Sequence, residues 1–278
     1  MNLVGLDVGG TAVRALRESG GVRGEVARRP VPGDYDSLLA LLAELVGEAP
    51  EAVGVGLPGT CEGDRALFVP ALPYLRDRPL GRDLAERVGA PVRLGLDGHL
   101  TLLAEAREGA ARGLRSAVLV AVGTGIGGAF MADGRIWRGA HGSAGSWGWL
   151  PADPPHAEAG HGPFERAASG SALGGRGPAL VAAARRGDPS ATAELETYAV
   201  RLARGVAALA SVLDPEAVLV GGGMADAMDV LGPMLDAHVA RYASPDGRRV
   251  PVLATGLGSH AGVVGALLAA GIGDAWQS

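Results

Sequence analysis

Short apolar runs recur along the chain and predict the strands of buried sheets. The runs are nearly continuous, which is typical of strands that are covered on both faces. Two pairs of them flank turn residues and predict hairpins, with Ser19-Gly20-Gly21 in one turn and Asp133-Gly134 in the other. The predicted strands are residues 3–8, 12–17, 22–28, 52–57, 92–96, 117–122, 129–131, 135–137, 217–220 and 251–255.

Between these runs, hydrophobic residues recur at helical spacing. Leu38, Leu41, Leu42 and Leu45, for example, fall on one face of a predicted helix. By contrast, residues 139–165 are rich in Gly, Pro, His and Ser and are predicted to form a loop. The predicted helices are residues 35–47, 83–88, 100–112, 171–186, 189–212, 226–242 and 261–270.

The same order of elements occurs twice. Each half opens with an apolar strand, a loop of Gly and Thr, and hairpin strands, and then continues with strand–helix units. This pattern predicts an α/β protein with two lobes and a central cleft between the lobes, where small ligands commonly bind. We place the small lobe over residues 1–112 and the large lobe over residues 113–259.

The composition of the chain argues against two classes of binding partner, membranes and nucleic acids. Of the 278 residues, 47% are hydrophobic and 20% are charged, which suits a folded core and argues against disorder. Gly, Arg or Asp interrupts every long apolar stretch, so we expect neither a membrane-spanning helix nor a membrane partner. The net charge is −5 and no long basic run is present, so a nucleic-acid partner is not expected.

The lack of lysine and the presence of one cysteine exclude several catalytic mechanisms. All 25 basic residues are arginine, which excludes a Walker A loop, a protein-kinase strand lysine and Schiff-base catalysis. Cys61 is the only cysteine, so no disulfide forms within the chain, and we expect a buried, inert thiol there. No basic segment precedes the first apolar run, so no secretory signal is expected and we predict a cytoplasmic location. Ser143 and His141 lack the strand and G-x-S-x-G elbow of a hydrolase.

The first glycine loop, Asp7-Val8-Gly9-Gly10-Thr11, follows the first predicted strand. Gly9 and Gly10 let backbone N–H groups approach an anion, and Thr11 adds a hydroxyl donor. Asp7 is placed to hold Mg²⁺ beside a triphosphate, directly or through water. A plain hairpin turn with a capping Asp fits the same residues.

A second glycine loop, Gly123-Thr124-Gly125-Ile126-Gly127-Gly128, matches the dinucleotide pattern G-x-G-x-x-G. A hairpin follows it in place of a helix, and residues 143–149 contain no acid to bind a ribose, so the context excludes a Rossmann site. We interpret Gly123, Thr124 and Gly125 as a second phosphate-binding hairpin. A third loop, Gly221-Gly222-Gly223, would let adenine or ribose pack on the backbone, although a tight strand-to-helix turn is the alternative.

These segments, in this order, resemble the ROK family of repressors, open reading frames and sugar kinases, within the actin-like ATPase superfamily. LDVGGTAVRA and VGTGIGGAF resemble its two phosphate motifs, and GLDGHLTLLAEA at 95–106 resembles its catalytic E-N-D segment. Further matches are GLPG at 56–59, RGAHGSAGSWGWL, FERAASGSAL at 164–173, DPEAVLVGGGM and LGSHAGVVGALL. The chain starts at the phosphate loop, so we expect no helix-turn-helix of the family's repressors.

The resemblance implies a two-lobed actin-like ATPase (ribonuclease H-like) fold, with a terminal helix at 260–273 that packs back on the small lobe. It implies ATP- and Mg²⁺-dependent phosphorylation of a sugar hydroxyl, with Asp97 as the general base. Gly222 and Gly223 would contact the nucleotide. A homodimer is a further expectation from the family. The alternative is a non-catalytic sugar- or nucleotide-binding relative that acts as a sensor or partner.

The sugar pocket departs from the family pattern. Gly59, Asp97 and Glu165 match the family's pocket residues, but four polar positions hold other residues, namely Ala71, Leu96, Ser146 and Trp149. Each unpaired buried sugar hydroxyl costs on the order of 1–3 kcal/mol, so ordinary glucose binding is not expected. Trp149 fits two interpretations, one that stacks on an apolar sugar face or acyl group and one that is a core or interface tryptophan.

The family's zinc motif is also replaced. Its cysteine positions fall on His156, Glu158 and Pro163, and its histidine ligand falls on Trp149. His156 and Glu158 alone do not complete a tetrahedral site, so no zinc is expected, although His161 offers a third donor. A solvated loop with scattered histidines is the simpler interpretation.

Overall fold

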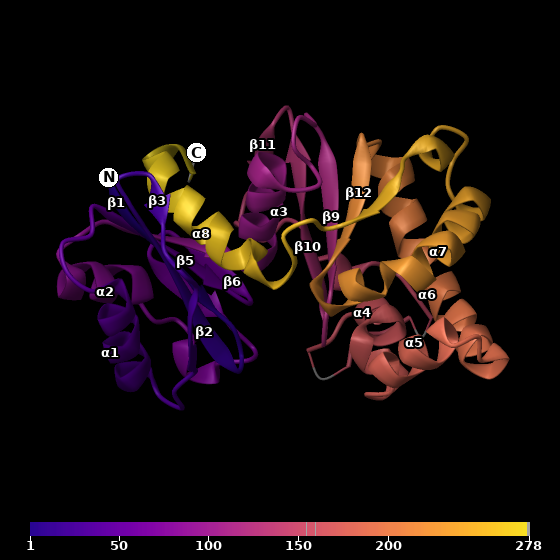
Figure 1. Ribbon diagram of the computed structural model, residues 1–278, viewed down its shortest axis with the longest axis horizontal. Coiled ribbons are helices and arrows are strands. Elements are labelled where there is room, and N and C mark those ends of the chain that lie inside the picture. The colour runs from indigo at the N-terminus through magenta and orange to yellow at the C-terminus, as the bar shows by residue number, and fades with distance from the viewer. Residues whose placement is uncertain (154, 159, 277–278) are drawn as a thin grey trace. The chain divides into compact units, whose positions relative to one another are not determined.

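The computed structural model describes residues 1–153, 155–158 and 160–276. The chain forms two compact units, each built on one mixed sheet (Figure 1). Unit 1 contains residues 1–104 and 138–144 and the chain from residue 259 onward. Unit 2 contains residues 105–137 and 145–258.

The sheet of unit 1 has the strand order β3-β2-β1-β5-β8, with β4 also paired to β2. β1 pairs antiparallel with β2 and parallel with β5, and β5 pairs parallel with β8. A separate small hairpin joins β6 to β7. The strands are β1 (Asn2–Val8), β2 (Ala12–Ser19), β3 (Val22–Arg23), β4 (Ala27–Pro30), β5 (Ala52–Leu57), β6 (Thr60–Glu62), β7 (Arg65–Phe68) and β8 (Val92–Leu96).

Helices cover both faces of this sheet. Side chains alternate along β1, so Val4, Leu6 and Val8 enter a core shared with α1 (Tyr35–Val46) and α2 (Leu80–Val88). The opposite face of β1 and β5 lies against α8 (Ala261–Ile272), drawn in yellow in Figure 1. Asp7 belongs to this second face, because it alternates with Leu6 and Val8.

Glycines allow α8 to approach the sheet closely. A Cβ on Gly5 would lie 2.5 Å from the backbone N of Leu267, and one on Gly54 would lie 1.9 Å from the carbonyl O of Ala266. Such separations are far inside van der Waals contact, so only glycine fits at either position. The two glycines therefore fix how the helix sits on the strands that lead toward Asp7.

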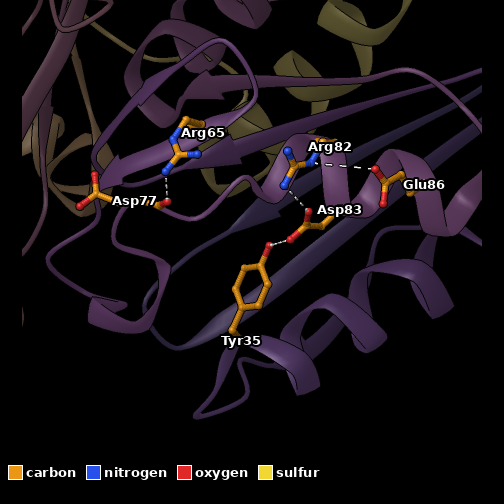
Figure 2. Close-up of polar contacts among 6 residues, drawn as sticks. All are labelled: Tyr35, Arg65, Asp77, Arg82, Asp83 and Glu86. Atoms are coloured by element: carbon orange, nitrogen blue, oxygen red, sulfur yellow. Dashed lines mark hydrogen bonds and ion pairs between the residues drawn. The ribbon is translucent and has the colours of Figure 1, made fainter.

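The outer helices of unit 1 are joined by a polar contact (Figure 2). The hydroxyl of Tyr35, at the start of α1, donates to Oδ2 of Asp83 in α2 at 2.7 Å. Arg82 lies between Asp83 and Glu86 and pairs with both carboxylates. In the β6–β7 hairpin, Arg65 donates to the backbone carbonyl of Asp77. The Tyr35–Asp83 hydrogen bond therefore links α1 to α2.

Unit 2 repeats the plan of unit 1. Its sheet has the order β11-β10-β9-β12-β13, again an antiparallel hairpin side followed by two parallel strands. The main core lies between β9 and β12 and the long helix α6 (Figure 1). The elements are β9 (Ala117–Val122), β10 (Ile126–Ala132), β11 (Arg135–Trp137), α4 (Pro163–Ala168), α5 (Gly177–Arg185), α6 (Pro189–Leu213), β12 (Ala217–Gly221), α7 (Met228–Tyr242) and β13 (Val252–Ala254).

The matching strand orders confirm the repeat predicted from the pattern of elements. Helix α3 (Asp97–Glu108) begins three residues earlier than predicted, directly after β8. The helix predicted over 171–186 is broken, because Gly174 and Gly175 have positive φ angles of 58° and 75°. Residues 222–227 form a 3₁₀ segment before α7.

Two other predictions needed correction. The predicted strand over 22–28 is two short strands, β3 and β4, which pair with opposite ends of β2 along the edge that β1 leaves open. The β6–β7 hairpin was missed, because its strands are short and do not alternate clearly. No helix in the described part of the chain is long and apolar enough to cross a lipid bilayer.

Candidate active site

Asp97 lies where β8 ends and α3 begins. Gly56 and Gly95 leave room for Leu100, since a Cβ on either would come within 3.0 Å of the leucine side chain. The first turn of α3 therefore folds tightly over the strand ends and fixes the Asp97 backbone. The Asp97 Oδ1 atom accepts a 2.7 Å hydrogen bond from the N–H of Gly98.

The electrostatic setting of Asp97 suits a proton acceptor. Its side chain is reachable by solvent, yet the surrounding protein desolvates the carboxyl group. This desolvation raises its pKa to about 6, and the nearby Asp7 carboxylate acts in the same direction against the Gly98 hydrogen bond. A carboxylate with a pKa just below neutrality is ionised at pH 7 and still basic enough to accept a proton.

Asp7 occupies a recess formed by glycines. Its Oδ2 atom pairs with Nη1 of Arg14 across the β1–β2 ladder at 3.2 Å. A Cβ on Gly262 of α8 would lie 3.1 Å from the Asp7 carboxyl carbon, and one on Gly56 would lie 3.6 Å from Oδ1. Burial raises the pKa of Asp7, and Arg14 offsets part of this effect. The Asp7 carboxylate also raises the pKa of Asp97, and a carboxylate such as that of Asp7 is a suitable oxygen ligand for a divalent cation.

The turn between β1 and β2 contains Gly9, Gly10 and Thr11. The N–H of Gly9 donates to the carbonyl of Ala12 at 2.9 Å, which closes the tight hairpin. Gly10 and Thr11 are exposed at its tip, and a Cβ on Gly10 would lie 3.0 Å from the methyl of Ala71. The structure thus confirms the hairpin, while anion binding by this turn stays a prediction.

Gly59 and Cys61 lie just after β5. A Cβ on Gly59 would lie 2.1 Å from the carbonyl O of Phe68 in β7, so this position requires glycine. Cys61 is 1% exposed, and burial raises the pKa of its thiol to about 11. The structure confirms that the thiol is buried, and its raised pKa disfavours the thiolate at neutral pH.

In unit 2, the second glycine turn borders a cavity of about 550 Å³. Gly123 and Thr124 lie on its wall beside Gly223, which follows β12. Gly222 has a φ of +72°, and a Cβ there would lie 2.5 Å from the carbonyl O of Val122, so the turn after β12 depends on this glycine. The cavity is bounded by Val122, Gly123, Thr124, Gly170, Ser171, Leu173, Gly175, Gly177, Pro178, Val181, Arg185, Gly223, Met224, Asp226 and Ala227.

Glu165 is fixed against the same glycine turn. Its Oε2 atom accepts from the N–H of Ile126 at 2.8 Å, and its Oε1 atom pairs with Nδ1 of His161. A Cβ on Gly125 would lie 2.3 Å from Oε2, so glycine at 125 makes room for the carboxylate. Two partners therefore set the orientation of the Glu165 carboxylate against residues 125–126.

Trp149 and Ser146 frame a short 3₁₀ turn in unit 2. Trp149 is 57% exposed, which excludes the core interpretation of this tryptophan. Its neighbour Trp147 is the structural one, because its Nε1 donates to the carbonyl of Leu119 at 2.8 Å. Stacking on a ligand and contact with a partner remain the two interpretations of Trp149.

The comparisons with known proteins agree with this geometry. The sequence profile of the ROK family matches residues 3–271. The chain belongs to the ROK family. It is 30% identical to the glucokinase of Streptomyces coelicolor and to the N-acetylgalactosamine kinase AgaK of Shewanella sp., with 95% of each chain covered in both cases.

Solved ROK structures share the fold over almost the whole chain. A ROK hexokinase from Thermus thermophilus superposes with a TM-score of 0.83 at 32% identity and covers 98% of both chains. A ROK glucokinase from Streptomyces griseus, in complex with glucose and AMPPNP, gives a TM-score of 0.83 at 28% identity, with 98% of this chain and 100% of that chain covered. The predicted actin-like fold class is therefore confirmed, and sugar-kinase function is supported at the level of the ROK family.

Two buried polar residues, His99 and Glu105, lie in the segment that resembles the catalytic segment of the ROK family and were not named by the sequence. His99 is fully buried, and its Nε2 lies 2.7 Å from the carbonyl O of Ala144. Burial lowers the pKa of His99 to about 4, so the ring is neutral and donates through Nε2. Glu105 accepts hydrogen bonds from the N–H groups of Ala110, Gly256 and Leu257. Both contacts are distant in sequence, so only the folded chain reveals them.

Direct ion pairs hold the loop in which ROK relatives are expected to bind zinc. Arg166 pairs with Glu158 and donates to the carbonyl of His156, while His161 pairs with Glu165. Among the described residues, which omit 154 and 159, no group of three or more His, Cys, Asp or Glu side chains is placed to hold a metal ion. The described part of the loop is therefore held by ion pairs and a hydrogen bond between its own residues.

Proposed function

We propose that this ROK protein transfers the γ-phosphoryl group of ATP to a sugar hydroxyl, with Asp97 as the general base. The observation that carries the proposal is the placement of Asp97 at a strand end, ionised at neutral pH yet basic. The cavity of unit 2 is bordered by the second and third glycine loops, at Gly123 and Gly223, and it supports a nucleotide as the co-substrate. The relatives support the same chemistry, because their names include a glucokinase and an N-acetylgalactosamine kinase.

Each residue has a separate part in this proposal. Asp97 accepts the proton of the acceptor hydroxyl and orients its oxygen toward the phosphorus. Gly9, Gly10, Thr11, Gly123, Thr124 and Gly125 offer backbone N–H and hydroxyl donors to phosphate oxygens. Asp7 would hold Mg²⁺, which supplies positive charge to the triphosphate when it is bound. Because the chain has no lysine, these groups and arginine are its means of stabilising that charge.

The acceptor is proposed to carry an apolar face or an acyl group. Ala71 and Leu96 stand where ROK sugar kinases are expected to have polar partners, and Leu96 is 8% exposed and buried in the core. Trp149 is exposed and offers an aromatic surface, and Glu165 offers a fixed carboxylate. These side chains therefore gain more binding free energy by stacking on an acetamido group or a sugar face than by hydrogen bonds to every hydroxyl.

A sugar panel tests the proposed activity. ATP consumption should be stimulated by at least one of glucose, N-acetylglucosamine, N-acetylgalactosamine and N-acetylmannosamine, with a higher kcat/KM for an N-acetylated sugar than for glucose. A coupled ADP assay with each sugar in the presence of Mg²⁺ measures this. If ATP binds and no sugar stimulates turnover, the protein is a sensor or partner that binds without catalysis. The related fold of a ROK transcriptional regulator, at a TM-score of 0.85 and 22% identity, shows that the fold alone does not decide this point.

The pH profile tests the role of Asp97 independently. The base works only in its ionised form, and its pKa is raised to about 6. The kcat/KM for the sugar should therefore be flat above pH 7 and fall about tenfold per pH unit below pH 6, because this ratio reports the pKa of the free enzyme. Steady-state kcat/KM between pH 5 and pH 8.5, with saturating ATP and Mg²⁺, gives the profile. A kcat/KM that stays constant down to pH 5 would exclude Asp97 as the proton acceptor.

A further inference from the structure

The wall of the unit 2 cavity contains few groups that could recognise a nucleobase. Of its 15 lining residues, five are glycines and six are apolar. The polar side chains are Thr124, Ser171, Arg185 and Asp226. A nucleobase placed here would therefore be held mainly by contact with apolar side chains and backbone.

Two of the four polar side chains are already engaged. The hydroxyl of Ser171 donates its proton to the carbonyl of Thr124 at 2.7 Å. Arg185 donates through Nε and Nη2 to the two carboxylate oxygens of Asp229, at 2.8 and 2.7 Å, and through Nη2 to the carbonyl of Asp226. These bonds hold the wall together and leave little capacity to recognise a base edge.

No wall side chain carries an amide, which is the side-chain group that places a donor and an acceptor side by side. Adenine presents an amino donor beside a ring acceptor, and guanine presents the reverse order, so an amide is the side chain best suited to discriminate between them. The chain has one asparagine, Asn2, and one glutamine, Gln277. Asn2 lies on β1 in unit 1, where its side chain bonds to Ala49 and Ser19, and Gln277 lies outside the described residues. Asn2 therefore does not belong to the wall of this cavity.

The fourth polar side chain, Asp226, suits a different part of a nucleotide. A carboxylate only accepts hydrogen bonds at neutral pH, and its two oxygens match two neighbouring hydroxyl groups. The ribose of a nucleotide carries such a pair of hydroxyls. Arg185, bonded to the Asp226 carbonyl, fixes the backbone from which this carboxylate projects.

We propose that this cavity selects the phosphoryl donor by its ribose, through Asp226, and not by its base. The inference rests on the proposed function, because it takes the occupant to be a nucleoside triphosphate. ATP, GTP and ITP then serve as donors of similar affinity, while loss of the 2′-hydroxyl weakens binding. Asp226 is the specificity-determining residue.

Calorimetric titration of the full chain with ATP, GTP and 2′-deoxy-ATP, each with Mg²⁺, tests this inference. The expected Kd of GTP is within tenfold of that of ATP, and the Kd of 2′-deoxy-ATP is about tenfold weaker. In Asp226→Ala, ATP should weaken to the level of 2′-deoxy-ATP. Asp236→Ala is the matched control, because Asp236 is an exposed aspartate of α7 outside the cavity wall, and it should leave all three affinities unchanged.

The outcomes separate the inference from the proposed function. A GTP affinity more than tenfold weaker than that of ATP, or ribose discrimination that survives in Asp226→Ala, overturns the inference and leaves phosphoryl transfer from ATP intact. If the chain binds none of the three nucleotides, the inference and the proposed function both fail. If all three nucleotides bind as described but no sugar stimulates ATP consumption, the inference holds for a nucleotide-binding protein that does not catalyse transfer.

Discussion

Replacing Asp97 by asparagine is expected to lower kcat for sugar phosphorylation by about 10³-fold and to leave ATP affinity unchanged. Asparagine has nearly the shape of aspartate and keeps the hydrogen bond that Asp97 accepts from the N–H of Gly98. It cannot take the proton of the acceptor hydroxyl. The loss should therefore appear in the chemical step. ATP affinity should stay unchanged, because the described residues that line the cavity assigned to the nucleotide all belong to unit 2.

Asp83→Asn is the control for this variant. Asp83 is an aspartate of the same unit whose carboxylate accepts from the hydroxyl of Tyr35 at the periphery (Figure 2). Its loss should change thermal stability slightly and kcat by less than about twofold. Steady-state kinetics for both variants, together with calorimetry for ATP, make the comparison. An Asp97→Asn enzyme that turns over at the wild-type rate would show that another group accepts the proton.

Gly54→Ala is expected to destabilise the protein by about 3 kcal/mol or more, or to prevent folding. The added Cβ would lie 1.9 Å from the carbonyl O of Ala266 and 2.8 Å from its carbonyl carbon. Both are backbone atoms of α8, so no side chain can move aside, and the helix must shift off β5. That shift would also displace Gly262, which lies against Asp7, so activity should fall with stability.

The measurement is equilibrium unfolding in guanidinium chloride, with Gly33→Ala as the control. Gly33 is exposed, and a Cβ there would meet no atom within 4 Å, so that variant should remain within about 0.5 kcal/mol of wild type. Equal stability of Gly54→Ala and Gly33→Ala would contradict the close packing of α8 on the sheet. In that case the recess around Asp7 would need another explanation.

Hydrophobic pattern alone was sufficient to predict the two sheets. The runs at β1, β5, β9 and β12 are almost entirely apolar because both faces of each strand are covered. The position of Asp97 at a strand end followed from the same pattern. Short elements such as β6 and β7 were missed, because three or four residues carry too little periodicity.

The rest of the site depends on contacts between residues that are distant in sequence. Nothing near His99 in the chain indicates that its ring bonds to the carbonyl of Ala144. Likewise, packing of the strands and helices is needed to bring Glu165 to its partners Ile126 and His161. The same packing forms the wall of the unit 2 cavity. Motif matching named Glu165 as a residue of interest, but its orientation is a tertiary property.

A structure of the ternary complex, with Mg²⁺, a non-hydrolysable ATP analogue and the sugar that the panel selects, tests the central claim most directly. We expect an acceptor hydroxyl at roughly 2.6–3.2 Å from an Asp97 carboxylate oxygen, with the same hydroxyl facing the γ-phosphorus. A sugar bound with every hydroxyl out of hydrogen-bond reach of Asp97, or a γ-phosphate directed away from that carboxylate, would contradict it.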